Sequence, residues 1–173
     1  NEVMGQCSYI SVVDLDNEKL LYDENEKKKI LVNHCKSANL SENVYNNLSL
    51  STQFMFPFLC SQFVCNDHYK KCGERFFMNP HECIIEELDR VKKHNDVQYA
   101  VLILCLLNNN ELKDVKLLPE ELKRDVYDRC CKSSETTSYL ITNALNLLTG
   151  VYVTQIDNQF SFIHDSIQEI VGY

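Results

Sequence analysis

Glycine and proline are scarce in this chain, which has 4 Gly and 3 Pro among 173 residues. Sandwiches and barrels of short strands need frequent turns, and these two residue types supply many of them. The hydrophobic residues, 45% of the chain, come in clumps separated by charged faces, as in amphipathic helices. We therefore predict a mainly helical protein, with enough apolar residues for one domain or two small ones.

The first half of the chain has the start and stop signals of helices. Three segments carry them: residues 23–36, 54–73 and 79–94. Residues 9–15 are β-branched and alternate loosely, which predicts a short strand, and one helical turn is expected around residues 41–46. We expect residues 1–94 to form a helical region with a short N-terminal strand.

The second half, residues 95–173, alternates helical and extended patterns in a fixed order. Helices are predicted at residues 97–109, 119–131 and 134–150, a β-hairpin at 151–164, and a last helix from Asp165. Three helices, a hairpin and a further helix is the order of a winged-helix domain with an added terminal helix. The hairpin would be its wing.

Charge and cysteine usage limit the classes of function. The formal net charge is −8, so no broad basic surface is expected for nucleic acid. The longest apolar run, residues 100–107, is shorter than the roughly 20 residues that cross a bilayer, and we expect no membrane contact. The nine cysteines are an odd number without framework spacing, which indicates free thiols in a reducing compartment. A cytoplasmic location is therefore expected.

Four residues are candidates for a metal site: Cys60, Cys65, His68 and Cys72. On one continuous helix, the last three would share a face and could converge on zinc. Their spacing matches no common zinc module, and the alternative is that Cys60 and Cys65 pack in the core while His68 faces solvent. The packing interpretation is favoured, so no metal site is predicted, while Cys65, His68 and Cys72 remain an open question.

Catalysis by this chain alone is not expected. It contains no nucleotide-binding loop of the G-x-x-x-x-G-K-S/T or G-x-G-x-x-G type, and no nucleophile elbow. Sequence-specific DNA binding is also disfavoured, because residues 134–149, the helix that would enter the major groove, contain no Lys or Arg.

The pair His164–Asp165 lies where the last strand pattern changes into the last helix. Asp165 is suited to cap that helix, with Gln168 three residues later completing a capping box. A cap needs no imidazole before it, so His164 has two open interpretations. It is either a partly buried structural histidine or a hydrogen-bond donor to a phosphate at the positive end of the helix.

Two segments resemble motifs of the STAND-class signalling ATPases, which include the NB-ARC and NACHT proteins. "FSFIHDSIQEIV" at 160–171 is similar to their methionine-histidine-aspartate motif, with Ile163 in place of the methionine. "FMFPFLCSQF" at 54–63 is similar to their glycine-x-proline motif, with Met55 in place of the glycine. In detail, "FF-x-NP" at 76–80 and "LLTGVYV" at 147–153 are most similar to a branch of this class found in large invertebrate immune-type proteins.

The resemblance implies a helical lid followed by a winged-helix domain, in a chain whose P-loop domain precedes Asn1. In that family the proline, here Pro57, contacts adenine, and the histidine, here His164, contacts the β-phosphate of ADP. It also implies ADP or ATP with Mg²⁺ as ligands of the full-length protein, no enzymatic activity of this part alone, and self-oligomerisation on activation. The alternatives are a winged-helix nucleic-acid binder and a ligand-free helical protein-interaction module.

Overall fold

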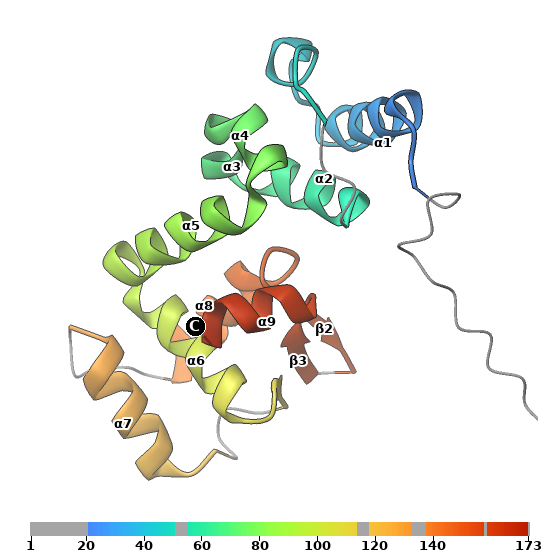
Figure 1. Ribbon diagram of the computed structural model, residues 1–173. Helices are drawn as coiled ribbons and strands as arrows, with labels where there is room; N and C mark the ends of the chain where they lie inside the picture. The colour runs from blue at the N-terminus through green and yellow to red at the C-terminus, as the bar shows by residue number, and fades with distance from the viewer. Residues whose placement is uncertain (1–20, 51–54, 114–117, 133–137, 158, 173) are drawn as a thin grey trace, which may run out of the picture.

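The computed structural model describes residues 21–50, 55–113, 118–132, 138–157 and 159–172. Over these residues the protein is mainly helical, with a small three-stranded antiparallel sheet near its C-terminal end (Figure 1). The predicted mainly helical class is confirmed. The strand predicted at residues 9–15 lies outside the described residues.

The first part of the chain contains only helices among its described elements. These are α1 (Glu24–Ser37), the 3-10 helix η2 (Glu42–Val44), α2 (Phe56–Cys65), α3 (Asp67–Cys72), α4 (Glu74–Met78) and α5 (Pro80–His94). Helix α1 begins with a capping box, in which the Asp23 carboxylate accepts from the Glu26 N–H at 2.8 Å and Glu26 accepts from the Asp23 N–H. The helical turn expected around residues 41–46 is present as η2.

The single helix predicted over residues 54–73 is wrong, because the chain forms two helices there, α2 and α3. Asn66 adopts an extended conformation, and its side chain accepts from the His68 N–H at 2.8 Å, so it ends α2 and caps α3. Gly73 ends α3 with φ +58°, a conformation that only glycine adopts readily. The break at Asn66 therefore interrupts the helical pattern, whereas the end at Gly73 agrees with the predicted stop.

The second part of the chain continues with helices and three short strands. They are α6 (Asp96–Leu107), β1 (Glu111–Leu112), α7 (Glu120–Cys130), α8 (Ser138–Leu148), β2 (Val153–Ile156), β3 (Gln159–Phe162) and α9 (Asp165–Gly172). The hairpin of β2 and β3 was predicted. Strand β1 was not: it pairs with β3 on the side opposite β2, with Leu112 facing Phe160, and gives the sheet order β1-β3-β2.

Helix α6 is the centre of the second part, and α5, α7, α8 and α9 all pack against it (Figure 1). Its sequence is apolar nearly all round, and its buried residues face several neighbours at once. The buried apolar residues form one cluster that extends from Leu31 in α1 to Val171 in α9. Among the described helices, none is both long and apolar enough to cross a membrane.

Candidate functional site

His164 is the residue from which helix α9 starts. Its carbonyl oxygen accepts from the N–H groups of Ile167 at 3.0 Å and Gln168 at 3.3 Å, and its ring Nδ1 accepts from the Ser166 N–H at 3.1 Å. These bonds make His164 the N-cap, while Asp165 is the first helical residue. The capping role predicted for Asp165 is therefore corrected by one position, and the structural interpretation of His164 takes a form that was not predicted, that of the cap itself.

The cap bond also fixes where the proton of the neutral ring lies. A ring nitrogen that accepts a hydrogen bond carries no proton, so Nε2 of His164 is the N–H donor. The carboxylate of Asp165 is exposed in the first turn, where negative charge is favourable to the helix dipole. One imidazole can thus cap the helix through Nδ1 and donate to another group through Nε2.

Helix α2 contributes the second half of the site. The rings of Phe58 and His164 are in contact, with centroids 5.2 Å apart and planes tilted by 32°. Pro57 precedes Phe58 in the first turn of α2, where its missing N–H has no intrahelical acceptor to lose, and it is half-buried. The structure therefore brings the segment of Pro57 close to His164, although the two are far apart in the sequence.

Met55 completes the contact between α2 and α9. It holds a left-handed conformation, φ +50° and ψ +31°, at the N-cap of α2, which glycine would adopt at lower cost. Its Sδ accepts a weak hydrogen bond from the Ser166 hydroxyl at 3.6 Å. Both helix starts are thus tied to each other by Met55 and Phe58.

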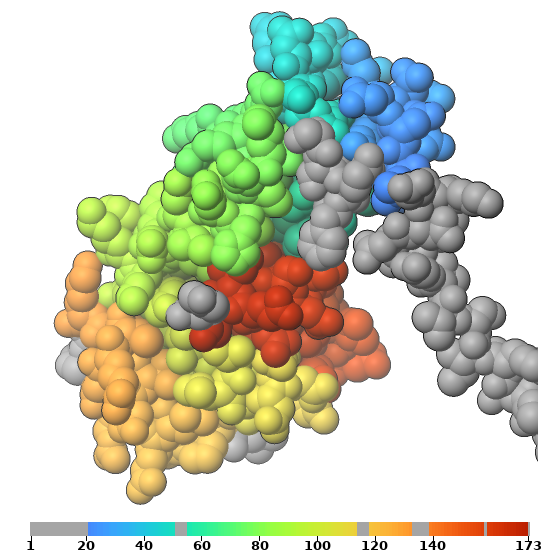
Figure 2. All heavy atoms as spheres, in the orientation of Figure 1, coloured from blue at the N-terminus to red at the C-terminus, as the bar shows by residue number. Residues whose placement is uncertain are grey.

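A pocket of about 290 Å³ opens beside these residues. Its lining comes from α2, α5, α9 and the residue before α2: Met55, Phe58, Leu59, Pro80, His81, Ile84, Ser166, Ile167, Glu169 and Ile170. It is mostly apolar, with one imidazole and one carboxylate. Figure 2 shows the surface of α9 between those of α5 and α6. Pockets of this kind, next to a few polar groups, are where proteins commonly bind small molecules.

The residues predicted as metal candidates do not converge as a set. Cys60 is fully buried in α2, and Cys65 is exposed at the end of α2, before the break at Asn66. The shared helix face of Cys65, His68 and Cys72 therefore does not exist. His68 and Cys72 instead remain together on α3.

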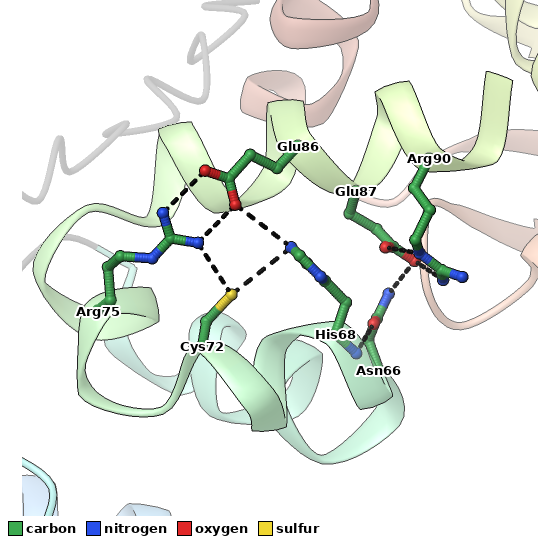
Figure 3. A network of polar contacts seen from close by, with 7 residues as sticks. All are labelled: Asn66, His68, Cys72, Arg75, Glu86, Glu87 and Arg90. Atoms are coloured by element: carbon green, nitrogen blue, oxygen red, sulfur yellow. Dashed lines mark hydrogen bonds and ion pairs between the residues drawn. The ribbon is translucent and has the colours of Figure 1, made fainter. Parts of the chain in front are cut away.

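Two residues from neighbouring helices join His68 and Cys72 (Figure 3). The Nε2 atom of His68 lies 3.5 Å from Cys72 Sγ and 3.6 Å from Glu86 Oε2. Arg75 donates to both oxygens of Glu86, through Nη1 at 2.8 Å and through Nη2, and Nη2 also lies 3.4 Å from Cys72 Sγ. Arg75 keeps the pKa of the Glu86 carboxyl below its usual range, since the guanidinium stabilises the charged form.

Sequence reasoning missed the partners that come from other elements. Phe58 and Ser166 adjoin the residues of the two recognised motifs, so the motifs themselves were a signal for them. Glu86 and Arg75 belong to no motif with His68, because they are brought together only by the packing of α3, α4 and α5. A helical pattern cannot reveal such a contact in advance.

Comparisons with protein-family models, curated proteins and solved structures found no match to this chain.

Proposed function

We propose that this chain is a nucleotide-state-sensing regulatory module of a STAND-type signalling ATPase, which holds the ADP-bound closed state and rearranges for oligomerisation. The observation that carries the proposal is the contact between the rings of Phe58 and His164, 5.2 Å apart. It joins the proline-containing start of α2 to the histidine-containing start of α9. In the proposed module these two starts face the same nucleotide.

The order of elements supports this assignment. From α6 to α9 it is helix, strand, two helices, hairpin and helix, which is the order of a winged-helix domain with the β2–β3 hairpin as its wing. In the proposal this domain covers residues 95–173. Residues 1–94, with helices α1 to α5, are the helical lid.

The nucleotide contacts follow from the polarity of each group. The Nε2–H of His164 and the positive end of α9 suit a phosphate oxygen of ADP, and Pro57 presents an apolar face to adenine. At Met55 the backbone is left-handed, as suits a position where glycine is common in the family. An upstream P-loop domain would bind the remaining phosphates and Mg²⁺, so this chain alone is not an enzyme.

Switching in this proposal is a population shift between two arrangements. ADP stabilises the closed arrangement because it contacts His164 only there. When ADP leaves or ATP replaces it, the winged-helix domain moves away from the P-loop domain, and the protein self-associates. Such signalling would take place in the cytoplasm.

The test separates the capping role of His164 from its ligand role in the full-length protein. His164→Asn keeps a side-chain oxygen that can accept from the Ser166 N–H, yet removes the Nε2 donor. We expect it to leave thermal stability almost unchanged while speeding ADP release and raising basal self-association. His94→Asn changes an exposed histidine at the end of α5 and is the matched control. Wild-type ADP release and self-association by a folded His164→Asn protein would overturn the proposed contact.

The capping bond favours one alternative, a ligand-free helical interaction module. If His164 only caps α9, His164→Asn should behave as wild type and His164→Ala should lose stability alone. The nucleic-acid alternative has less support, because α8, the helix that would read a major groove, carries no Lys or Arg. A salt-dependent shift of duplex DNA by this chain would favour that alternative instead.

A further inference from the structure

Three potential metal ligands of different chemistry meet at one point between α3 and α5. They are an imidazole nitrogen of His68, the thiol sulfur of Cys72 and a carboxylate oxygen of Glu86, all within 4.8 Å of one another (Figure 3). His68 directs the same atom, Nε2, at both other groups. The set therefore shares a common centre rather than forming a chain of separate contacts.

The separations of these atoms can be compared with those around a tetrahedral zinc ion. Zinc bonds of roughly 2.0–2.3 Å at tetrahedral angles place neighbouring ligand atoms about 3.4–3.6 Å apart. The observed separations are 3.5 Å from His68 Nε2 to Cys72 Sγ and 3.6 Å from His68 Nε2 to Glu86 Oε2. These two edges match, and the third, from Cys72 Sγ to Glu86 Oε2, lies within 4.8 Å and would shorten to the same range on metal binding.

We propose that His68 Nε2, Cys72 Sγ and Glu86 Oε2 bind a divalent cation of the zinc class. The mixed donor set selects that class, because thiolate and imidazole favour Zn²⁺ over Mg²⁺ and Ca²⁺, which prefer oxygen ligands. On binding, the Cys72 thiol releases its proton to solvent and the sulfur forms the metal bond. His68 binds through its Nε2 lone pair and keeps its proton on Nδ1.

Arg75 is the positive group that stands beside these ligands in the structure. Its Nη2 contacts both Cys72 Sγ and Glu86 Oε2, so it satisfies two of the three ligand atoms. The side chain is 47% exposed and can turn into solvent when a metal ion replaces it. Arg75 and the metal ion therefore compete for the same two atoms. A variant without the guanidinium, such as Arg75→Gln, should bind the metal ion more tightly.

The three ligands come from two helices, His68 and Cys72 from α3 and Glu86 from α5. A metal ion held by Cys72 and Glu86 would therefore link α3 to α5 directly, as structural zinc sites link small elements. A water molecule can occupy the fourth position of a tetrahedral zinc ion, so three protein ligands are sufficient.

Titration of the reduced chain with Co²⁺, followed by competition with Zn²⁺, tests the site. Tetrahedral Co²⁺ with a thiolate ligand gives a charge-transfer band and visible d–d bands, which report the sulfur directly. We expect one Co²⁺ per chain, displaced by one Zn²⁺. Cys72→Ser and Glu86→Gln should weaken binding by about 100-fold or more, since loss of even an outer-shell partner costs 10–100-fold.

Matched substitutions outside the cluster complete the design. Cys65→Ser removes an exposed thiol at the end of α2, and Glu82→Gln removes an exposed carboxylate one turn before Glu86. Both variants should bind Co²⁺ as the wild type does. Arg75→Gln should bind more tightly, and this gain does not depend on a damaged fold. Absence of stoichiometric binding by wild type and Arg75→Gln, or a thiolate band that survives Cys72→Ser, would overturn the proposal.

Discussion

His164 is an uncommon choice for the residue that starts a helix. Ser, Thr, Asp and Asn are the preferred N-caps, and any of them could accept from the Ser166 N–H at lower cost. A histidine there gives up part of that preference and gains a hydrogen-bond donor, Nε2–H, on a ring that contacts Phe58. Histidine is a weaker N-cap than these residues but offers an additional hydrogen-bond donor. This difference is a physical reason to expect a second role for His164.

Cysteine reactivity offers a test of the residue environments on α2. Burial raises the pKa of Cys60 to about 12, so its thiolate is scarce at pH 8, whereas Cys65 is exposed on the same helix. With iodoacetamide at pH 8, we expect peptide mass spectrometry to find Cys65 modified rapidly and Cys60 protected until urea unfolds the chain. Equal labelling of both in the native protein would show that α2 does not bury Cys60.

Glu87 stabilises the turn at Asn66 that separates α2 from α3. Its buried carboxylate accepts from Asn66 Nδ2 at 3.0 Å, and Arg90 donates to it through Nε and Nη2, both at 2.6 Å (Figure 3). Asn66 ends one helix and caps the next, so the carboxylate fixes the side chain that turns the chain. A charged residue at this depth is acceptable because both its oxygens are hydrogen-bonded.

The loss of this carboxylate should be costly. We expect Glu87→Ala to lower the free energy of unfolding by about 2–3 kcal/mol, since Asn66 keeps a buried donor without its acceptor and Arg90 loses its partner. Urea unfolding followed by far-UV circular dichroism measures the change. Asp89→Ala, an exposed acid on the same helix, should stay within about 0.5 kcal/mol. Similar losses for both variants would contradict the role given to Glu87.

The elements that sequence analysis predicted well are those with local signals. The capping box of Asp23 and the proline in the first turn of α5 mark the starts of their helices. The two strands of the hairpin are close in the sequence, so their pairing is also a local feature. Strand β1 has two residues and exists only through its pairing with β3, and Asn66 breaks a helix partly through a contact with Glu87 on α5. Such features depend on distant residues, so a local pattern could not show them.

The residues of the candidate site also divide into those with a local sequence signal and those that only tertiary packing brings together. Pro57 and His164 were identified from short motifs, and the structure brings their segments together. The cap position of His164 was missed because histidine is not among the preferred caps. Glu86 was missed because only the packing of α3 on α5 brings it to His68 and Cys72.

Helix α9 is where the two parts of the chain meet. It packs against α5 and α6, and its Ile167 is fully buried beside residues of α2 and α5 that line the same pocket. The apolar core is continuous across the predicted boundary between residues 94 and 95. Shared burial of this kind makes the two parts stabilise each other, so unfolding of one should promote unfolding of the other.

Ile167→Ala tests whether the two parts unfold together. We expect a loss of about 2–4 kcal/mol, because the variant leaves a cavity at a fully buried position. Hydrogen exchange with mass spectrometry should then show faster exchange in peptides of α2 as well as in those of α6 and α8. Ile156→Ala, at a position that is 65% exposed in β2, should change neither. Faster exchange confined to residues after 94 would instead mean that the predicted boundary separates two independently folding domains. The contact between Phe58 and His164 would then open without unfolding of residues 1–94.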